Sequence, residues 1–235
     1  MMLFRHSPTA LLFVTSLIIT ACSSNPNSSS GSAVKLSVKG IGNAGGSAVQ
    51  SLQVNAANVT ITSVRIVIDE VELESSVGDT LDFELEQPFI KDLMAGSGTQ
   101  VIQTVQVPAG SYKELEIEID ELNPKDGAVY TANPELQGRS VLVRGYVDTP
   151  ADTFRFVSDL EEEQEQEFEP PIVLDENSPA TNIVLTLNMD LWFVDEKGNF
   201  LDPRLQENKS AIEGNIKNSI DAFEDKDDDG ERDDD

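Results

Sequence analysis

The chain of 235 residues carries 16 Lys and Arg against 43 Asp and Glu, so its formal charge is −27 and its pI is near 4.1. A chain this acidic repels polyanions, which argues against nucleic acid as a partner. Hydrophobic residues make up 39% and charged residues 25%, the composition of one ordinary globular domain.

The first 21 residues have the three-part layout of a secretory signal. A cationic start at Arg5 precedes an apolar run from Leu11 to Ile19, which is too short to span a bilayer as a helix. The tetrad Ile19-Thr20-Ala21-Cys22 resembles the lipobox of bacterial lipoproteins, in which cleavage leaves the Cys as residue one, carrying diacylglycerol and a fatty acyl group. The alternative is a plain signal peptide with an incidental Cys.

This resemblance implies that residues 1–21 are removed and that Cys22 anchors the chain in membrane lipid. The residue after Cys22 is Ser23 and not an Asp, a pattern similar to that of lipoproteins sent to the bacterial outer membrane. Residues 22–33 are rich in Ser and nearly free of apolar side chains, so we expect a flexible tether.

The chain has one His, His6, and one Cys, Cys22, and both lie at the N-terminus. The mature chain therefore lacks the residues needed for His-activated nucleophiles, Cys/His zinc sites or disulfides. We interpret it as a non-enzymatic protein.

From residue 34 onward the dominant hydrophobic period is two, which is typical of strands with one buried face. The parity of the apolar positions changes near 62–63 and again near 69–70, which predicts a bulge or bend at each place. About ten strands are predicted, within 34–38, 49–54, 59–61, 64–68, 71–73, 81–85, 115–119, 141–147, 154–157, 172–174 and 183–193.

One helix is predicted from Ala211 to Phe223, because Ile212, Ile216 and Ile220 recur at four-residue spacing. Many short strands with a single late helix predict a mainly β protein. We expect a single antiparallel β-sandwich, immunoglobulin- or prealbumin-like, with a C-terminal helix over residues 34–223. Residues 224–235 remain as an acidic tail.

Residues 59–73, 88–93 and 107–112 resemble segments of an uncharacterised family of bacterial lipoproteins with a prealbumin-like sandwich. Residues 145–147 and 190–193 look similar too. The resemblance implies the fold and the lipid anchor, and it brings no catalytic residues. Independently, the Pro-Ala-Gly turn at 108–110 predicts that Tyr112 fills a corner of the sandwich.

The last 15 residues contain 10 acidic side chains, and part of them follows a calcium-loop pattern. Oxygen ligands stand at loop positions 1, 3, 5 and 9, the turn-forming Gly230 is at position 6, and position 7 offers its carbonyl. The closing position 12 would fall beyond residue 235. The candidate Ca²⁺ ligands are Asp225, Asp227, Asp229, Glu231 and Asp233. The alternative is a solvated polyanionic tail.

Two other acidic stretches also have alternative interpretations. Asp159 to Glu169 holds seven carboxylates and no base, so we expect a hydrated mobile loop, with capture of divalent cations as the alternative. Glu114, Glu116 and Glu118 alternate with apolar residues and therefore share one strand face, about 7 Å apart. That spacing suits an inverting glycosidase, and it is equally expected of a solvated outer face.

The features together predict a lipid-anchored protein of the bacterial outer membrane, periplasmic or surface-exposed. We expect it to act as a binding or structural module for an envelope protein or glycan, with Ca²⁺ as the candidate effector. The alternative is a carboxylate-based surface enzyme acting on polysaccharide.

Overall fold

The computed structural model describes residues 31–41, 50–54, 57–78, 82–85, 87–94, 100–175, 181–225, 227 and 229–232, and their strands form three sheets. Sheet A has the order β13 (Ile220–Asp225), β12 (Thr181–Asn188), β1 (Gly31–Ile41) and β7 (Gln100–Pro108). Sheet B has the order β10 (Thr153–Ser158), β9 (Val141–Val147), β3 (Ala57–Ile68) and β2 (Gln50–Val54), and β6 (Phe89–Asp92) also pairs with β3. Sheet C has the order β11 (Glu162–Leu174), β8 (Gly110–Ile119), β4 (Glu70–Ser75) and β5 (Phe83–Leu85).

Helices are minor elements of the described chain. The α-helices are α1 (Ala128–Ala132) and α2 (Lys209–Lys217), and short 3₁₀ turns cover Pro124–Asp126, Met189–Leu191 and Gln206–Asn208. No helix in the described part of the chain is long and apolar enough to cross a membrane. The signal segment 1–21, Cys22 and residues 23–30 of the tether lie outside the described residues.

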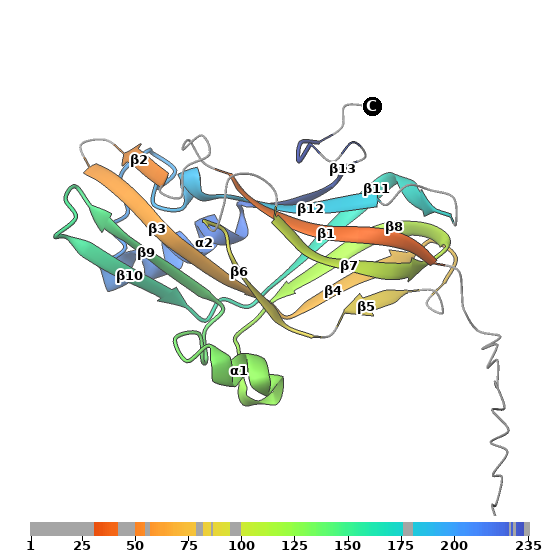
Figure 1. Cartoon of the computed structure of the whole chain (residues 1–235). Coiled ribbons are helices and arrows are strands. Elements are labelled where there is room, and N and C mark those ends of the chain that lie inside the picture. The colour runs from red at the N-terminus through yellow and green to blue at the C-terminus, as the bar shows by residue number, and fades with distance from the viewer. Residues whose placement is uncertain are drawn as a thin grey trace, which may run out of the picture.

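Sheets A and C form the two layers of a sandwich at one end of the elongated molecule, and sheet B occupies the other end (Figure 1). Leu36 of β1 and Ile183 of β12 belong to the same buried core cluster as Val71 of β4 and Ile117 of β8.

The mainly β prediction is confirmed. Strands β1 and β12 pair in parallel, whereas the other strand pairs in the described sheets are antiparallel.

The two predicted irregularities are confirmed. The register between β3 and β9 shifts between Ile61 and Ser63. Strand β3 ends at Ile68 and β4 begins at Glu70, so the chain passes from sheet B to sheet C at Asp69. The parity changes in the sequence therefore mark a bulge and a change of sheet.

The predicted corner residue Tyr112 is fully buried, and its hydroxyl donates a hydrogen bond to the Pro108 carbonyl at 2.8 Å. Trp192 is also fully buried, and its indole Nε1 donates to Ser219 Oγ at 2.8 Å. Each large ring thus has a partner for its polar atom, as burial of Tyr and Trp requires.

The predicted helix Ala211–Phe223 is wrong at its end, because α2 stops at Lys217 and the chain continues as strand β13. Ser219 Oγ donates to the Ile216 carbonyl at 2.7 Å and so satisfies one of the last carbonyls of the helix. Strand β13 then pairs with the edge of β12. The isoleucine spacing fits a helix, but the strand edge offers hydrogen bonds that sequence periodicity does not show.

The prediction of a mobile loop over Asp159–Glu169 is also wrong. From Glu162 onward this segment belongs to β11, which pairs antiparallel with β8. Glu and Gln alternate there, so one set of side chains faces outward while the backbone completes the sheet. Because nearly every position carries a charged or polar side chain, the sequence does not show which side chains face outward, and the strand is not predicted.

We predict that Gly145→Ala destabilises the fold, because β9 and its neighbours approach closely at this position. A Cβ there would lie 2.1 Å from the Thr60 carbonyl oxygen and 2.8 Å from the Phe154 ring. We expect a loss of about 3 kcal/mol in the free energy of unfolding, measured by urea denaturation.

The matched control is Gly214→Ala in α2, where an added Cβ meets nothing within 4 Å. That variant should gain roughly 0.5–1 kcal/mol, since Ala is the better helix former. Equal stability of the two variants would contradict the packing around β9.

Candidate functional site

Asp225 is the last residue of β13 and is buried at the start of the C-terminal loop, with 1% of its surface exposed. Its Oδ2 accepts hydrogen bonds from Asn182 Nδ2 and from the Gly230 amide, both at 2.9 Å, and its Oδ1 accepts one from the Asp229 amide at 3.1 Å. Asn182 Oδ1 in turn accepts from Ser37 Oγ at 2.6 Å. A chain of hydrogen bonds from β1 through β12 therefore fixes this carboxylate.

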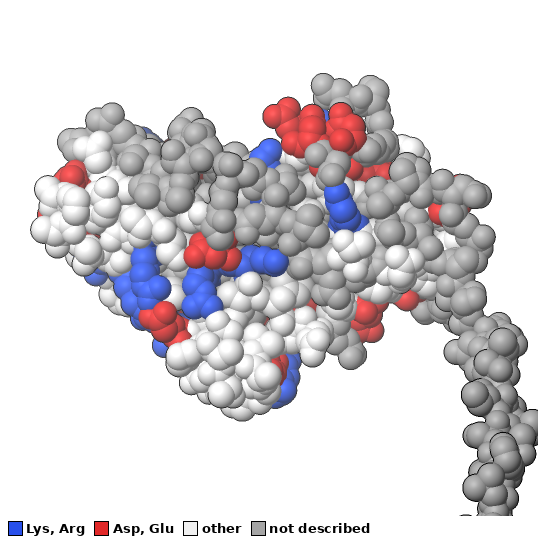
Figure 2. Space-filling model, viewed as in Figure 1, with Lys and Arg blue, Asp and Glu red and all other residues white. Residues whose placement is uncertain are grey.

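The loop brings two further carboxylates to Asp225. One carboxylate oxygen from each of Asp225, Asp227 and Asp229 lies within 4.8 Å of the other two, and the latter two side chains are exposed. Gly230 has a φ of +76°, which permits the turn that closes the loop. Figure 2 shows the acidic side chains gathered on this projection, above the sheet that contains β1 and β12.

The structure thus brings together three of the five predicted ligands. The Glu231 side chain is exposed and lies outside this group, and its amide donates to Asp229 Oδ1 at 2.8 Å. Asp233 falls beyond the described residues. The convergent set is Asp225, Asp227 and Asp229.

This arrangement can bind a hard cation. Ca²⁺ takes oxygen ligands at about 2.3–2.6 Å, so two oxygens on one ion lie no more than about 5 Å apart. The three carboxylates meet that limit, and an all-oxygen donor set favours Ca²⁺ or Mg²⁺ over softer metals. Lys39 Nζ donates to the Gly230 carbonyl at 2.6 Å, which ties the loop to β1 and offsets part of its negative charge.

The segment after the loop folds back on β13. Arg232 Nη2 donates to both carboxylate oxygens of Asp221, at 2.9 and 3.0 Å, and its guanidinium lies 5.2 Å from the centre of the Phe223 ring. Both members of the ion pair are 53% exposed, so the pair itself adds little stability. Its effect is to hold Arg232 against the edge strand β13.

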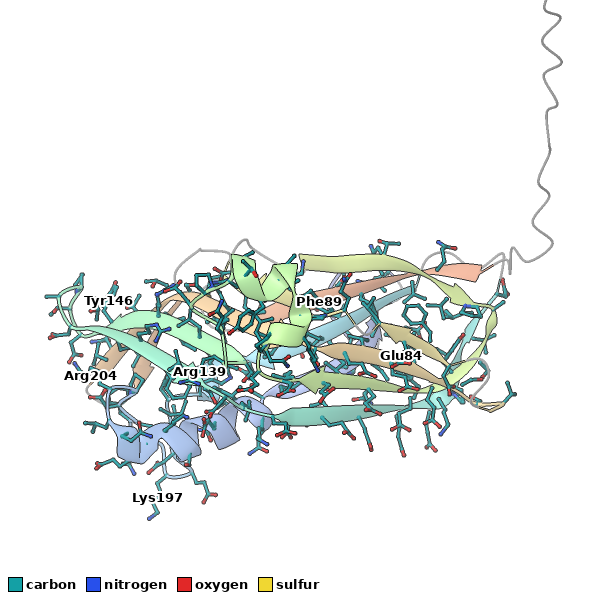
Figure 3. All side chains as sticks on the ribbon, turned by 90° about the horizontal axis from the view of Figure 1, so that it is seen from below. Glu84, Phe89, Arg139, Tyr146, Lys197 and Arg204 are labelled. Carbon is teal, nitrogen blue, oxygen red and sulfur yellow. The ribbon has the colours of Figure 1, made fainter. Side chains whose placement is uncertain are left out.

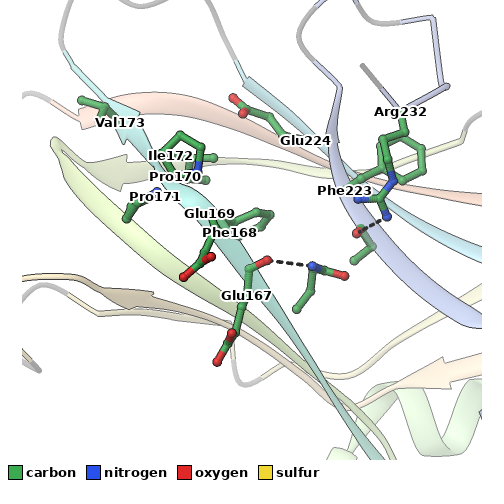
Figure 4. A pocket seen from close by; sticks show the side chains of 12 residues that line it. Glu167, Phe168, Glu169, Pro170, Pro171, Ile172, Val173, Phe223, Glu224 and Arg232 are labelled. Carbon is green, nitrogen blue, oxygen red and sulfur yellow. Dashed lines mark hydrogen bonds between the residues drawn. The ribbon is translucent and has the colours of Figure 1, made fainter. Parts of the chain in front are cut away.

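A groove of about 450 Å³ lies beside this arginine, between the edge strands β11 and β13 (Figure 4). Phe168 and Ile172 line it from β11, while Phe223 and Arg232 line it from the other side. The sequence does not predict the groove, because the spacing of its isoleucines favours a helix where β13 forms. The C-terminal loop that begins at Asp225 contains Arg232, which also lines the groove together with residues of β13.

A second acidic feature covers the outer face of sheet C, and we call it the glutamate ladder. Three strands place glutamates directly opposite one another, which confirms that Glu114, Glu116 and Glu118 share one face. The three rows are Glu70–Glu118–Glu163, Glu72–Glu116–Glu165 and Glu74–Glu114–Glu167. Glu84 of β5 lies opposite Glu72 and extends the middle row.

Carboxylates packed this way resist ionisation. Burial raises the pKa of Glu70 to about 7, and the carboxylates of Glu84, Glu118 and Glu72 add to the shift. The pKa values of four other ladder glutamates are raised too, first by burial and then by neighbouring carboxylates. They are Glu72, Glu114, Glu116 and Glu118.

The comparisons with known proteins give one structural similarity. No protein-family model matches this chain, and no curated protein matches it in sequence. The chain is similar in structure to MbnP from Methylosinus trichosporium, with a TM-score of 0.45 and 8% identity, over 82% of this chain and 97% of that chain. The similarity concerns the β-rich structure.

We predict that the protein loses stability as the pH rises between about 4.5 and about 7. A carboxyl group whose folded pKa exceeds its unfolded value binds more protons in the folded state, so deprotonation in this window favours unfolding. Glu70→Gln should therefore reduce the fall in melting temperature across the window and melt higher than the wild type at alkaline pH. The exposed Glu207→Gln serves as the control and should leave the pH profile unchanged. Identical profiles for Glu70→Gln and the wild type would contradict the prediction.

Proposed function

We propose that the protein is a lipid-anchored bacterial envelope protein whose β-domain is a calcium-responsive, non-enzymatic binding or structural module. The convergence of Asp225, Asp227 and Asp229 carries the calcium part of this proposal. The affinity should be weak, because an oxygen set of three carboxylates leaves several positions of Ca²⁺ to carbonyls and water.

The ion would act on the groove through the loop. Cation binding would hold Asp227 and Asp229 against Asp225, and the same loop leads directly to Arg232. Because Arg232 and Phe223 form one wall of the groove, a fixed loop would also fix that wall. We propose the groove as the place where an envelope protein or glycan would bind.

The anchor part of the proposal rests on the sequence. The lipobox-like tetrad ending at Cys22 precedes a Ser-rich tether that leads into β1 at Gly31. As a flexible coil this tether would span about 17 Å, enough to hold the domain just off a bilayer surface. No family model matches the chain. Membership of an uncharacterised lipoprotein family and an outer-membrane location are therefore proposed only from the resemblance of residues 59–73, 88–93 and 107–112 and from the lipobox-like tetrad.

We predict that Ca²⁺ raises the melting temperature of the mature protein. At about tenfold excess over the dissociation constant, binding to the folded state adds about 1.4 kcal/mol of stability. For a domain of this size that corresponds to roughly 3–5 °C in a calorimetric scan. The double variant Asp227→Asn/Asp229→Asn should lose this increment and remain folded, since both side chains are exposed.

The matched control, Glu196→Gln/Glu207→Gln, removes the same two charges from exposed positions outside the loop. It should keep the full calcium response. If the control and the loop variant respond equally, the effect is general charge screening and the loop is no calcium site. Mg²⁺ at the same ionic strength should give a smaller shift, because it demands a stricter octahedral geometry.

We predict that Cys22→Ala abolishes stable membrane association, because the acyl groups on Cys22 would supply the anchor. The measurement is fractionation of cell envelopes, with mass spectrometry of the purified wild-type protein to detect the acylated N-terminal Cys. Ser23→Ala is the control and should remain in the membrane fraction. Membrane association of the Cys22→Ala protein at the wild-type level would overturn the anchor.

A further inference from the structure

Strand β10 is an edge strand of sheet B. Within the described sheets it pairs with β9 on one side and with no strand on the other, so its outer edge presents a row of backbone N–H and C=O groups. A groove of about 340 Å³ runs along this edge, and five consecutive residues of the strand, 153–157, line it. Residues 203–206 and Lys209 form the opposite wall. Figure 3 views the molecule from below, with Arg204 of this wall labelled at the end that sheet B occupies.

The outer face of sheet B carries basic side chains, which gather above α1 in Figure 2. Arg155 of β10 lies directly opposite Arg144 of β9. Arg144 forms an ion pair with Glu135, whereas Arg155 donates only to the Glu135 backbone carbonyl, at 3.2 Å, and pairs with no carboxylate of the described chain. Like charges directly opposite one another destabilise a sheet. A carboxylate placed beside Arg155 would relieve this repulsion.

The inner side of the groove has a different character. Phe154 and Phe156 alternate with Arg155 along β10, and both are buried against the core. Pro203 and Leu205 line the same groove, and Leu205 keeps 47% of its surface exposed. An apolar side chain in the groove would cover this exposed leucine.

The basic residues of the opposite wall already have carboxylate partners. Arg204 pairs with Asp202, and Lys209 pairs with Asp159. Among the described residues that line the groove, Arg155 is therefore the cation without a carboxylate. The charge that a ligand can neutralise lies on the outer face, and the apolar surface that it can cover lies on the inner side.

A strand added beside β10 would meet these two sides alternately. Successive side chains of a strand point to opposite faces of a sheet, and directly opposite residues of neighbouring strands share a face. The residue opposite Arg155 would lie on the outer face, beside the guanidinium. The residues before and after it would lie on the inner side, opposite Phe154 and Phe156. This arrangement suits an acidic residue flanked by apolar ones.

We propose that the free edge of β10 binds an extended segment of a partner protein by strand addition, with acidic residues alternating with apolar ones. Backbone hydrogen bonds supply affinity, and the alternate side chains supply specificity at Arg155 and Leu205. Two copies of β10 paired about a two-fold axis at Arg155 would oppose their arginines, so the partner is a different chain. This proposal does not depend on the calcium loop or on the groove beside Arg232, because neither contains a residue of β10.

The probe is a short fluorescent peptide of alternating Glu and Val, and its binding to the mature protein is measured by anisotropy. Physiological salt screens charges more than about 8 Å away, which limits repulsion by the acidic remainder of the protein. A peptide of the same composition with its glutamates in one block is the control. We expect the alternating peptide to bind about tenfold more tightly. Equal affinity for the two peptides would overturn the proposal.

Backbone methylation of the peptide tests strand addition itself. In an extended chain the N–H groups of successive residues point to opposite edges, so methylated glutamate nitrogens block one edge and methylated valine nitrogens block the other. The form whose blocked edge faces β10 should bind about tenfold more weakly, and the other form should bind like the parent peptide. Equal affinities of the two methylated forms would show that no strand is added.

Protein variants locate the site. Arg155→Gln should weaken binding of the alternating peptide by about tenfold, because it removes the guanidinium that meets the acidic residue. Lys197→Gln is the matched control, since it removes one positive charge from an exposed position outside the groove. Leu205→Ala should weaken binding by about threefold through lost apolar contact, whereas Leu191→Ala, at a leucine that is 55% exposed elsewhere, should leave affinity unchanged.

Melting curves and sedimentation complete the test. Arg155 and Leu205 are both exposed, so their variants should melt close to the wild-type temperature. A folded Arg155→Gln protein that binds the alternating peptide as tightly as the wild type would overturn the site. Sedimentation of the protein without peptide should show that Arg155→Gln leaves the oligomeric state unchanged. A wild-type dimer that this variant alters would identify a second copy as the occupant of the edge and overturn the assignment to a partner protein.

Discussion

The in-register pairing of β8 with both β4 and β11 is the constraint on which the core and the acidic face depend. Leu115, Ile117 and Ile119 are buried on one side of β8, so the glutamates between them must lie on the other. Each buried aliphatic side chain stabilises the fold by about 1.5–3 kcal/mol, whereas an opposed pair of like charges costs at most about 1 kcal/mol. A slip by one residue would put the glutamates into the core. Burial therefore fixes the register, and the glutamate ladder follows from it.

Asp225 couples the sandwich to the C-terminal loop in a comparable way. Its carboxylate receives donors from a β12 side chain and from two loop amides, so the loop cannot move away without leaving buried polar groups unpaired. The predicted ligands Asp227 and Asp229 are exposed, whereas the buried Asp225 joins the loop to the sheet through its hydrogen bonds. An ion bound to the exposed pair would therefore act on the edge strand β13 through a residue that already belongs to the sheet.

The sequence predicts the parts of the fold that local signals specify. Alternation reveals β8, β9 and β10, and the turn before Tyr112 reveals the corner. The sequence does not predict strand β13, because Ile212, Ile216 and Ile220 have the spacing of a helix. The edge of β12, with which Ile220 pairs, is known only from the folded sheet. The groove cannot be predicted from local signals either, because it lies between two edge strands that are far apart in the sequence.

Backbone conformation decides what the acidic residues can bind. Asp225, Asp227 and Asp229 converge because the loop folds back so that the Asp229 and Gly230 amides donate to Asp225. The same two-residue spacing on the extended strand β8 keeps carboxylates about 7 Å apart. The carboxylates of the C-terminal loop therefore converge on one point, whereas those of the ladder stay distributed over the face of sheet C.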